Sequence, residues 1–164
     1  MAIRPVLVYP HPMLRQAVQP VTDFDQAQAV ARDLLDTMSS FSHCVGLAAP
    51  QIGVPLRMIA IDVSEHKKAE AFHGLMVLVN PVVVEDSGSE VGREGCLSLP
   101  EITANVVRAV RVRFDAALPD GREFSSMTCG FEARALLHEI DHLDGILILD
   151  RVASAAEIFE RRRK

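Results

Sequence analysis

Two histidines four positions apart, His138 and His142, enclose a glutamate, Glu139, in the segment 136–143. Because residues four apart lie on one face of an α-helix, about 5–6 Å from each other, both imidazoles can reach one metal ion. Glu139 lies roughly 100° around such a helix from His138, where it can contact a water at the ion rather than bind the ion itself. The spacing therefore indicates a metal-dependent hydrolase with Glu139 as the general acid and base, although so short a pattern also recurs by chance.

A site with two histidines needs a third protein ligand if one position is to stay open for water. A third histidine six residues after the second, as in metzincin proteases, is excluded because that position is Ile148. Two alternatives stay open. Glu157 or Glu160 on a later helix would indicate a gluzincin-like zinc endoprotease. Cys96 is the other candidate, and its small and polar neighbours predict an irregular loop rather than a core strand.

The composition is that of an ordinary globular protein, and we expect a single domain over residues 1–164, with 49% hydrophobic and 24% charged residues. The net charge of −5 gives no support for DNA binding, and no apolar run approaches the ~20 residues of a membrane span. Three widely spaced cysteines and an N-terminus unlike a secretory signal favour the cytoplasm. The basic run 161–164 is interpreted first as a solvated helix end and second as a contact for RNA or an acidic surface.

Hydrophobic periodicity predicts an amphipathic helix over residues 25–40 and a second helix over 131–143. Strands are predicted at 6–8, 58–63, 75–79, 106–114 and 123–127, with an exposed loop at 65–74, a turn at 119–121 and a last helix from 154 to the end. This order predicts an α+β fold. We expect antiparallel or mixed β-sheets packed around the central metal-binding helix, with an N-terminal amphipathic helix and a C-terminal helix.

Three segments, taken in order, resemble the signature motifs of the peptide deformylases. They are Gly46–Gly53 (GLAAPQIG), Glu94–Ser98 (EGCLS) and His138–Gly145 (HEIDHLDG). The similarity extends to Tyr9–Arg15 and Ile61–Val63, so it covers most of the chain. Three motifs in the right order and spacing are far more specific than the histidine pair alone.

The resemblance implies a hydrolase that removes the N-formyl group from the N-terminal methionine of nascent chains. Cys96, His138 and His142 would hold one divalent metal ion, with Fe(II) as the physiological ion and Zn(II), Ni(II) or Co(II) as substitutes. Glu139 would act as base and then as acid. Gln51 and the backbone N–H of Leu97 would face the developing oxyanion. The residues expected to bind substrate are Cys44, Val45, Gly46, Glu94, Gly95 and Phe131, of which Val45 and Phe131 would line the methionine pocket. The basic C-terminal tail would contact the ribosome.

The sequence departs from the family pattern at three positions. Leu137 stands where Gln is usual, Cys44 where Gly is usual, and Thr103 where many members have Arg. These departures leave two alternatives open: a deformylase-like paralogue with weak or altered acyl-substrate activity, and a non-catalytic module that binds formyl peptides. The remaining histidines and Cys129 show no ligand spacing, so we interpret the former as surface or loop residues and Cys129 as a packing residue; the histidines are His11, His43, His66 and His73.

Overall fold

The computed structural model describes residues 2–161, and Met1 and residues 162–164 lie outside the described part. Most of the basic C-terminal run, namely Arg162, Arg163 and Lys164, therefore lies outside it. Within residues 2–161 the chain forms two β-sheets and two α-helices, with short 3-10 helices between them. None of the described helices is both long and apolar enough to cross a membrane.

The larger sheet has five strands in the order β1-β2-β3-β6-β7, and every neighbouring pair is antiparallel. Its strands are β1 (Gly46–Ala48), β2 (Met58–Ile61), β3 (Met76–Ser87), β6 (Arg111–Ala117) and β7 (Glu123–Cys129). The smaller sheet has the order β4-β5-β8 and is also antiparallel. Its strands are β4 (Glu90–Cys96), β5 (Leu99–Arg108) and β8 (Ile158–Glu160).

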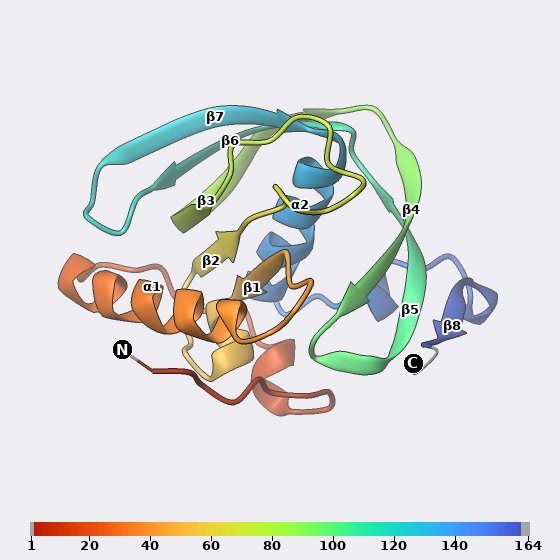
Figure 1. Ribbon diagram of the computed structural model, residues 1–164, viewed down its shortest axis with the longest axis horizontal. Coiled ribbons are helices and arrows are strands. Elements are labelled where there is room, and N and C mark those ends of the chain that lie inside the picture. The colour runs from red at the N-terminus through yellow and green to blue at the C-terminus, as the bar shows by residue number, and fades with distance from the viewer. Residues whose placement is uncertain (1, 162–164) are drawn as a thin grey trace.

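The helices are α1 (Phe24–Ser39) and α2 (Gly130–Leu143), and the 3-10 helices are η1 (Pro12–Arg15), η2 (Ala49–Ile52), η3 (Ile148–Asp150) and η4 (Ala155–Glu157). Figure 1 shows α2 running through the centre of the molecule, with β3, β6 and β7 above it and the β4–β5 hairpin beside it. The α+β class expected from the sequence is confirmed, and the two helices predicted at 25–40 and 131–143 are present.

Strand β2 separates the two helices because its side chains alternate between the faces of the sheet. Met58 and Ala60 belong to the apolar cluster that α1 covers. Ile59 and Ile61 belong to the cluster that α2 covers. All four side chains are fully buried, so the helix that carries His138 and His142 packs on a strand that is covered on both faces.

The start of α1 is fixed locally. The Asp23 side chain accepts hydrogen bonds from the backbone N–H groups of Asp25 and Gln26, which otherwise lack partners at a helix N-terminus. The apolar stripe of α1 then packs against the sheet through Val30, Leu34 and neighbouring residues.

Three strand predictions differ from the structure. Residues 6–8 form no strand. The Leu7 N–H donates to the Gln51 carbonyl and the Tyr9 N–H donates to the Ser98 carbonyl, but these two bonds do not continue into the regular pairing of a β-ladder. Asn80 does not end the strand before it. Its positive φ of 51° falls at a register shift between Val79 and Val82, and β3 continues beyond it to Ser87. Residues 106–114 are not one strand but the end of β5 and the start of β6, which lie in different sheets.

The predicted C-terminal helix is wrong within the described residues. The chain forms the single turn η4 and then β8, which pairs with β5 so that Ile102 faces Glu160 and Ala104 faces Ile158. The physical reason is non-local, since β5 offers an open edge whose backbone groups need partners. Cys96 likewise lies at the end of β4, at a register shift after Gly95, rather than in an irregular loop.

Candidate metal centre and its cavity

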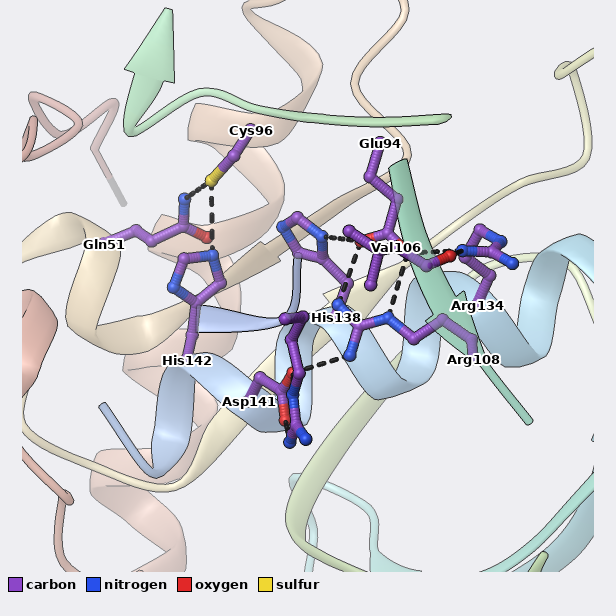
Figure 2. Close-up of polar contacts among 10 residues, drawn as sticks. Gln51, Glu94, Cys96, Val106, Arg108, Arg134, His138, Asp141 and His142 are labelled. Atoms are coloured by element: carbon purple, nitrogen blue, oxygen red, sulfur yellow. Dashed lines mark hydrogen bonds and ion pairs between the residues drawn. The ribbon is translucent and has the colours of Figure 1, made fainter. Parts of the chain in front are cut away.

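Cys96, His138 and His142 converge on one point although they come from two elements. Cys96 ends β4, and both histidines lie on α2, four residues and one turn apart. Their ligand atoms all lie within 4.8 Å of one another, and Sγ of Cys96 is 3.3 Å from Nε2 of His142. Figure 2 shows the thiol and the two rings facing one another. Within the described part of the chain this is the one such cluster of possible metal ligands.

The gluzincin alternative finds no support in this arrangement. Glu157 accepts a hydrogen bond from Nδ2 of Asn105 at 2.8 Å, and Glu160 lies on β8 in register with Ile102. Neither belongs to the ligand cluster found among residues 2–161. Cys96 is therefore the third residue of the cluster that could hold a metal ion.

Glu94 holds the ring of His138 from behind. Its Oε1 lies 2.8 Å from Nδ1 of His138, which leaves Nε2 of that ring to face the cluster. The same carboxylate accepts two hydrogen bonds from Arg108, both at 2.9 Å, and one from Arg134 at 2.8 Å. Arg108 also donates to Asp141 at 2.6 Å (Figure 2). A carboxylate behind a ligating imidazole fixes its tautomer and orientation.

The electrostatics of this group favour a positive charge in the cluster. Burial would raise the pKa of Glu94, but hydrogen bonds from His138 and Arg108 hold it well below its usual value. Burial would lower the pKa of His138, but the charge of Glu139 and the hydrogen bonds to Cys96 and Glu94 raise it well above its ordinary value. The anionic neighbours therefore stabilise a cation at this point, whether a proton or a metal ion.

His142 has the opposite environment. Burial, followed by the charges of His138 and Arg108, lowers its pKa well below the ordinary value. Its imidazole is therefore neutral, which is the form that binds a metal ion. Among the described residues its Nδ1 is buried without a hydrogen-bond partner.

Glu139 lies against β1 because Gly46 has no side chain. A Cβ on Gly46 would lie 2.6 Å from Oε2 of Glu139, closer than such atoms can approach. The other oxygen, Oε1, is buried and has no hydrogen-bond partner within the described residues. Burial raises the pKa of Glu139 to about 7, with a further contribution from the charge of Glu94. A carboxyl with a pKa near neutrality can both take and return a proton.

The side-chain amide of Gln51 is oriented by the backbone at the start of η2. Its Oε1 accepts the backbone N–H of Ala48 at 2.9 Å, so Nε2 points toward the cluster. There Nε2 donates to Oγ of Ser98 at 3.0 Å and makes a long contact of 3.6 Å with Sγ of Cys96. Leu97 lies between β4 and β5, in the two-residue turn that follows Cys96. The amide nitrogen thus points toward the ligand cluster.

A cavity of about 450 Å³ opens onto these groups. It brings together all the predicted catalytic, metal-binding and substrate-binding residues except His142, namely Cys44, Val45, Gly46, Gln51, Glu94, Gly95, Cys96, Leu97, Phe131, His138 and Glu139. Glu94 differs from the others because its carboxylate is buried and forms ion pairs with Arg108 and Arg134. It contacts His138 and does not present a free carboxylate to the cavity.

The cavity also contains residues that sequence reasoning missed, namely Ser42, His43, His66, Lys68, Arg93, Arg134, Ala135 and Arg161. The ring of His66 stacks on Phe131 with centroids 4.1 Å apart, so it is part of the cavity wall and not only an exposed loop residue. The loop position of His66 was predicted, but nothing in the sequence signals which side chain that loop would cover.

Cys44 lies at the cavity rim with its thiol donating to the Gly46 carbonyl at 3.3 Å. Burial, together with the charge of Glu139, raises the pKa of this thiol to about 11. At pH 8 roughly 0.1% of such a thiol is thiolate, so we expect iodoacetamide to modify Cys44 about a hundredfold more slowly than an ordinary exposed thiol. The exposed Cys129 provides the internal comparison in peptide mapping by mass spectrometry. Equal labelling of Cys44 and Cys129 would contradict this prediction.

Comparison with known proteins adds an independent finding. Residues 3–157 match the family model described as polypeptide deformylase. The peptide deformylase of Acidobacterium capsulatum is 39% identical over 164 residues, covering 99% of this chain and 94% of that protein. The crystal structure of a peptide deformylase from Legionella pneumophila superposes with a TM-score of 0.84 at 40% identity, covering 95% of this chain and 89% of that one. A class I type b peptide deformylase from Acinetobacter baumannii, bound to Met-Ala-Ser, gives a TM-score of 0.85 at 31% identity and covers 92% and 100%.

Proposed function

Because the chain belongs to the peptide deformylase family and removes the N-formyl group from nascent peptides, we propose that the cavity beside α2 is its active site. The observation that carries this proposal is the convergence of Cys96, His138 and His142 within 4.8 Å. Glu139, whose buried Oε1 has no hydrogen-bond partner among the described residues, lines the same cavity.

The three residues fit a divalent metal ion. One thiol and two imidazoles are a ligand set that suits both Fe(II) and Zn(II), and the orphaned buried atoms and anionic surroundings of the cluster favour a cation. When bound, the ion supplies Lewis acidity, which polarises a carbonyl and acidifies water. We propose Fe(II) as the physiological ion, with Zn(II), Ni(II) or Co(II) as substitutes.

The residues of the chain perform the proton transfers. Glu139 takes a proton from the water that attacks the formyl carbon, and the negative charge that develops falls on the formyl oxygen. Nε2 of Gln51 and the backbone N–H of Leu97 donate to that oxygen. Glu139 then returns the proton to the departing nitrogen as the carbon–nitrogen bond breaks. The products are formate and a peptide with a free N-terminal amine.

The methionine side chain is proposed to enter between Val45 and Phe131, with His66 stacked behind Phe131. Cys44, Gly46 and Gly95 would contact the peptide backbone, while Glu94 positions His138. We further propose that the protein works in the cytoplasm on nascent chains. The positive charge of residues 161–164 supports a ribosome contact through this tail, of which residues 162–164 lie outside the described part.

The test is deformylation of formyl-Met-Ala-Ser by anaerobically purified, Fe(II)-loaded protein, with the free amine quantified. We expect robust turnover, and we expect Cys96→Ser to lose both bound metal and activity. Cys129→Ser is the matched control, because that thiol is exposed and lies outside the cavity.

The same experiment separates the alternatives. A metal-loaded but inactive protein that still binds the peptide would indicate a non-catalytic module. Faster turnover of a different acyl group would indicate a paralogue with altered substrate. Unchanged metal content in Cys96→Ser would remove Cys96 from the ligand set and reopen the endoprotease alternative.

A further inference from the structure

Two exposed arginines, Arg93 and Arg161, stand at the rim of the cavity. Arg93 belongs to β4 and Arg161 directly follows β8, and both line the cavity. In the described part of the chain neither forms an ion pair with a carboxylate, whereas Arg134, the third arginine of the cavity, is paired with Glu94. The guanidiniums of Arg93 and Arg161 therefore place positive charge at the mouth of the cavity, and no carboxylate of the described residues is paired with them.

Backbone hydrogen bonds fix the position of Arg161. Strand β8 pairs with β5, and the N–H of Arg161 donates to the Glu101 carbonyl at 2.9 Å. Its guanidinium then fills the space beside Gly95, where a Cβ would lie only 1.9 Å from Nη2. Any larger residue at 95 would displace the guanidinium. Gly95 directly precedes Cys96, so this cation lies at the edge of the site itself.

Arg93 is held by the same strand. Its Cζ lies 3.7 Å from the centroid of the Phe159 ring on β8, a cation–π contact. Its Nε donates to Asn105 at 3.1 Å and its Nη1 to Thr103 at 3.3 Å, both on β5. These partners are neutral, so they orient the guanidinium without cancelling its charge.

We propose that Arg93 and Arg161 form a subsite for a carboxylate on the peptide downstream of the methionine. This inference rests on the proposed active site. An extended peptide advances about 3.3 Å per residue, so its second or third residue lies within reach of a cation that contacts Gly95. The carboxylate is either an Asp or Glu side chain or the C-terminus of a short peptide. Arginine suits this ligand because its planar fork can donate two hydrogen bonds to one carboxylate.

The test measures equilibrium binding, which needs no turnover. Dissociation constants of the product peptides Met-Ala-Glu-amide and Met-Ala-Gln-amide are compared by calorimetry on the metal-loaded, full-length protein. We expect the Glu peptide to bind about tenfold more tightly at low salt, and this preference to shrink at 0.5 M salt, as charge pairing at an open rim is screened. In Arg161→Gln the preference falls to about twofold or less, and Arg93→Gln reduces it partly.

A second pair of peptides, Met-Ala-Ala with a free or an amidated C-terminus, tells which source of carboxylate is preferred. Arg122→Gln is the control variant, since Arg122 lies in the β6–β7 connection outside the cavity and pairs with Asp120. Equal affinity for the Glu and Gln peptides in the wild type, or an undiminished preference in Arg161→Gln, overturns the inference. Deformylation of the neutral formyl-Met-Ala-Gln-amide tests the proposed function separately, because it does not depend on either arginine's charge preference.

Discussion

Replacing Glu139 by glutamine is expected to lower kcat for deformylation by about 10²–10⁴-fold, the range that a positioned general acid and base contributes. Glutamine has nearly the same size, so the packing against Gly46 is kept while the group that accepts and returns the proton is lost. We expect so large an effect because Oε1 of Glu139 is buried without a hydrogen-bond partner among residues 2–161 and because its pKa lies near neutrality. Initial rates with a formyl-Met peptide provide the measurement.

Metal analysis of the same variant separates a base from a ligand. If Glu139 acts only on protons, Glu139→Gln keeps its full metal content. The matched control is Glu157→Gln, which removes a carboxylate outside the ligand cluster and is expected to leave kcat unchanged. Retention of kcat within about tenfold in Glu139→Gln would assign the proton transfers to another group.

Removing the Glu94 carboxylate should damage the fold and the metal site together. In Glu94→Ala the buried guanidiniums of Arg108 and Arg134 lose the anion that both of them share. Breaking a buried ion pair from one side typically costs about 3–5 kcal/mol. For a chain of this size that corresponds to a fall in Tm on the order of 10 °C. Because His138 also loses its orienting partner, metal affinity should fall about 10–100-fold.

The control for burial is Glu85→Ala. Glu85 pairs with Arg113 at 3.7 Å, but its side chain is 72% exposed, and the change in Tm should be within experimental error. Calorimetric unfolding and a competitive chelator titration measure the two effects. Equal behaviour of Glu94→Ala and Glu85→Ala would mean that the buried cluster is not what holds α2 to the β4–β5 hairpin.

Local signals in the sequence were sufficient for the two α-helices and for the proximity of the two histidines on α2. The apolar stripe of α1 and the Asp23 cap lie within one continuous segment, so they can be recognised without tertiary information. The histidine pair on α2 is equally local, because helical geometry alone brings positions four apart together. Helical geometry could not select Cys96 as the third ligand, because the distance of Cys96 from α2 is set by the pairing of β4 with β5. The prediction of Cys96 as a ligand came from the family resemblance.

The errors arose where partners are distant in the chain. The boundary between β5 and β6 falls at Ala109 and Val110, which carry no turn signal, so two strands of different sheets read as one. Strand β8 exists because β5 offers it an edge, and no periodicity within residues 154–161 reports that edge. Arg108 looked like part of an alternating, half-exposed strand, yet it is buried between Glu94 and Asp141. Such networks are visible only once the sheets are assembled.

The division of the ligands between two layers has a mechanical consequence. Cys96 belongs to the three-stranded sheet, whereas His138 and His142 belong to the helix that packs on the five-stranded one. An ion shared by them is a cross-link between residues up to 46 positions apart, and closing so long a loop restricts the unfolded chain more than a short one would. A metal ion bound there would therefore also tie α2 to the smaller sheet and add to the stability of the fold.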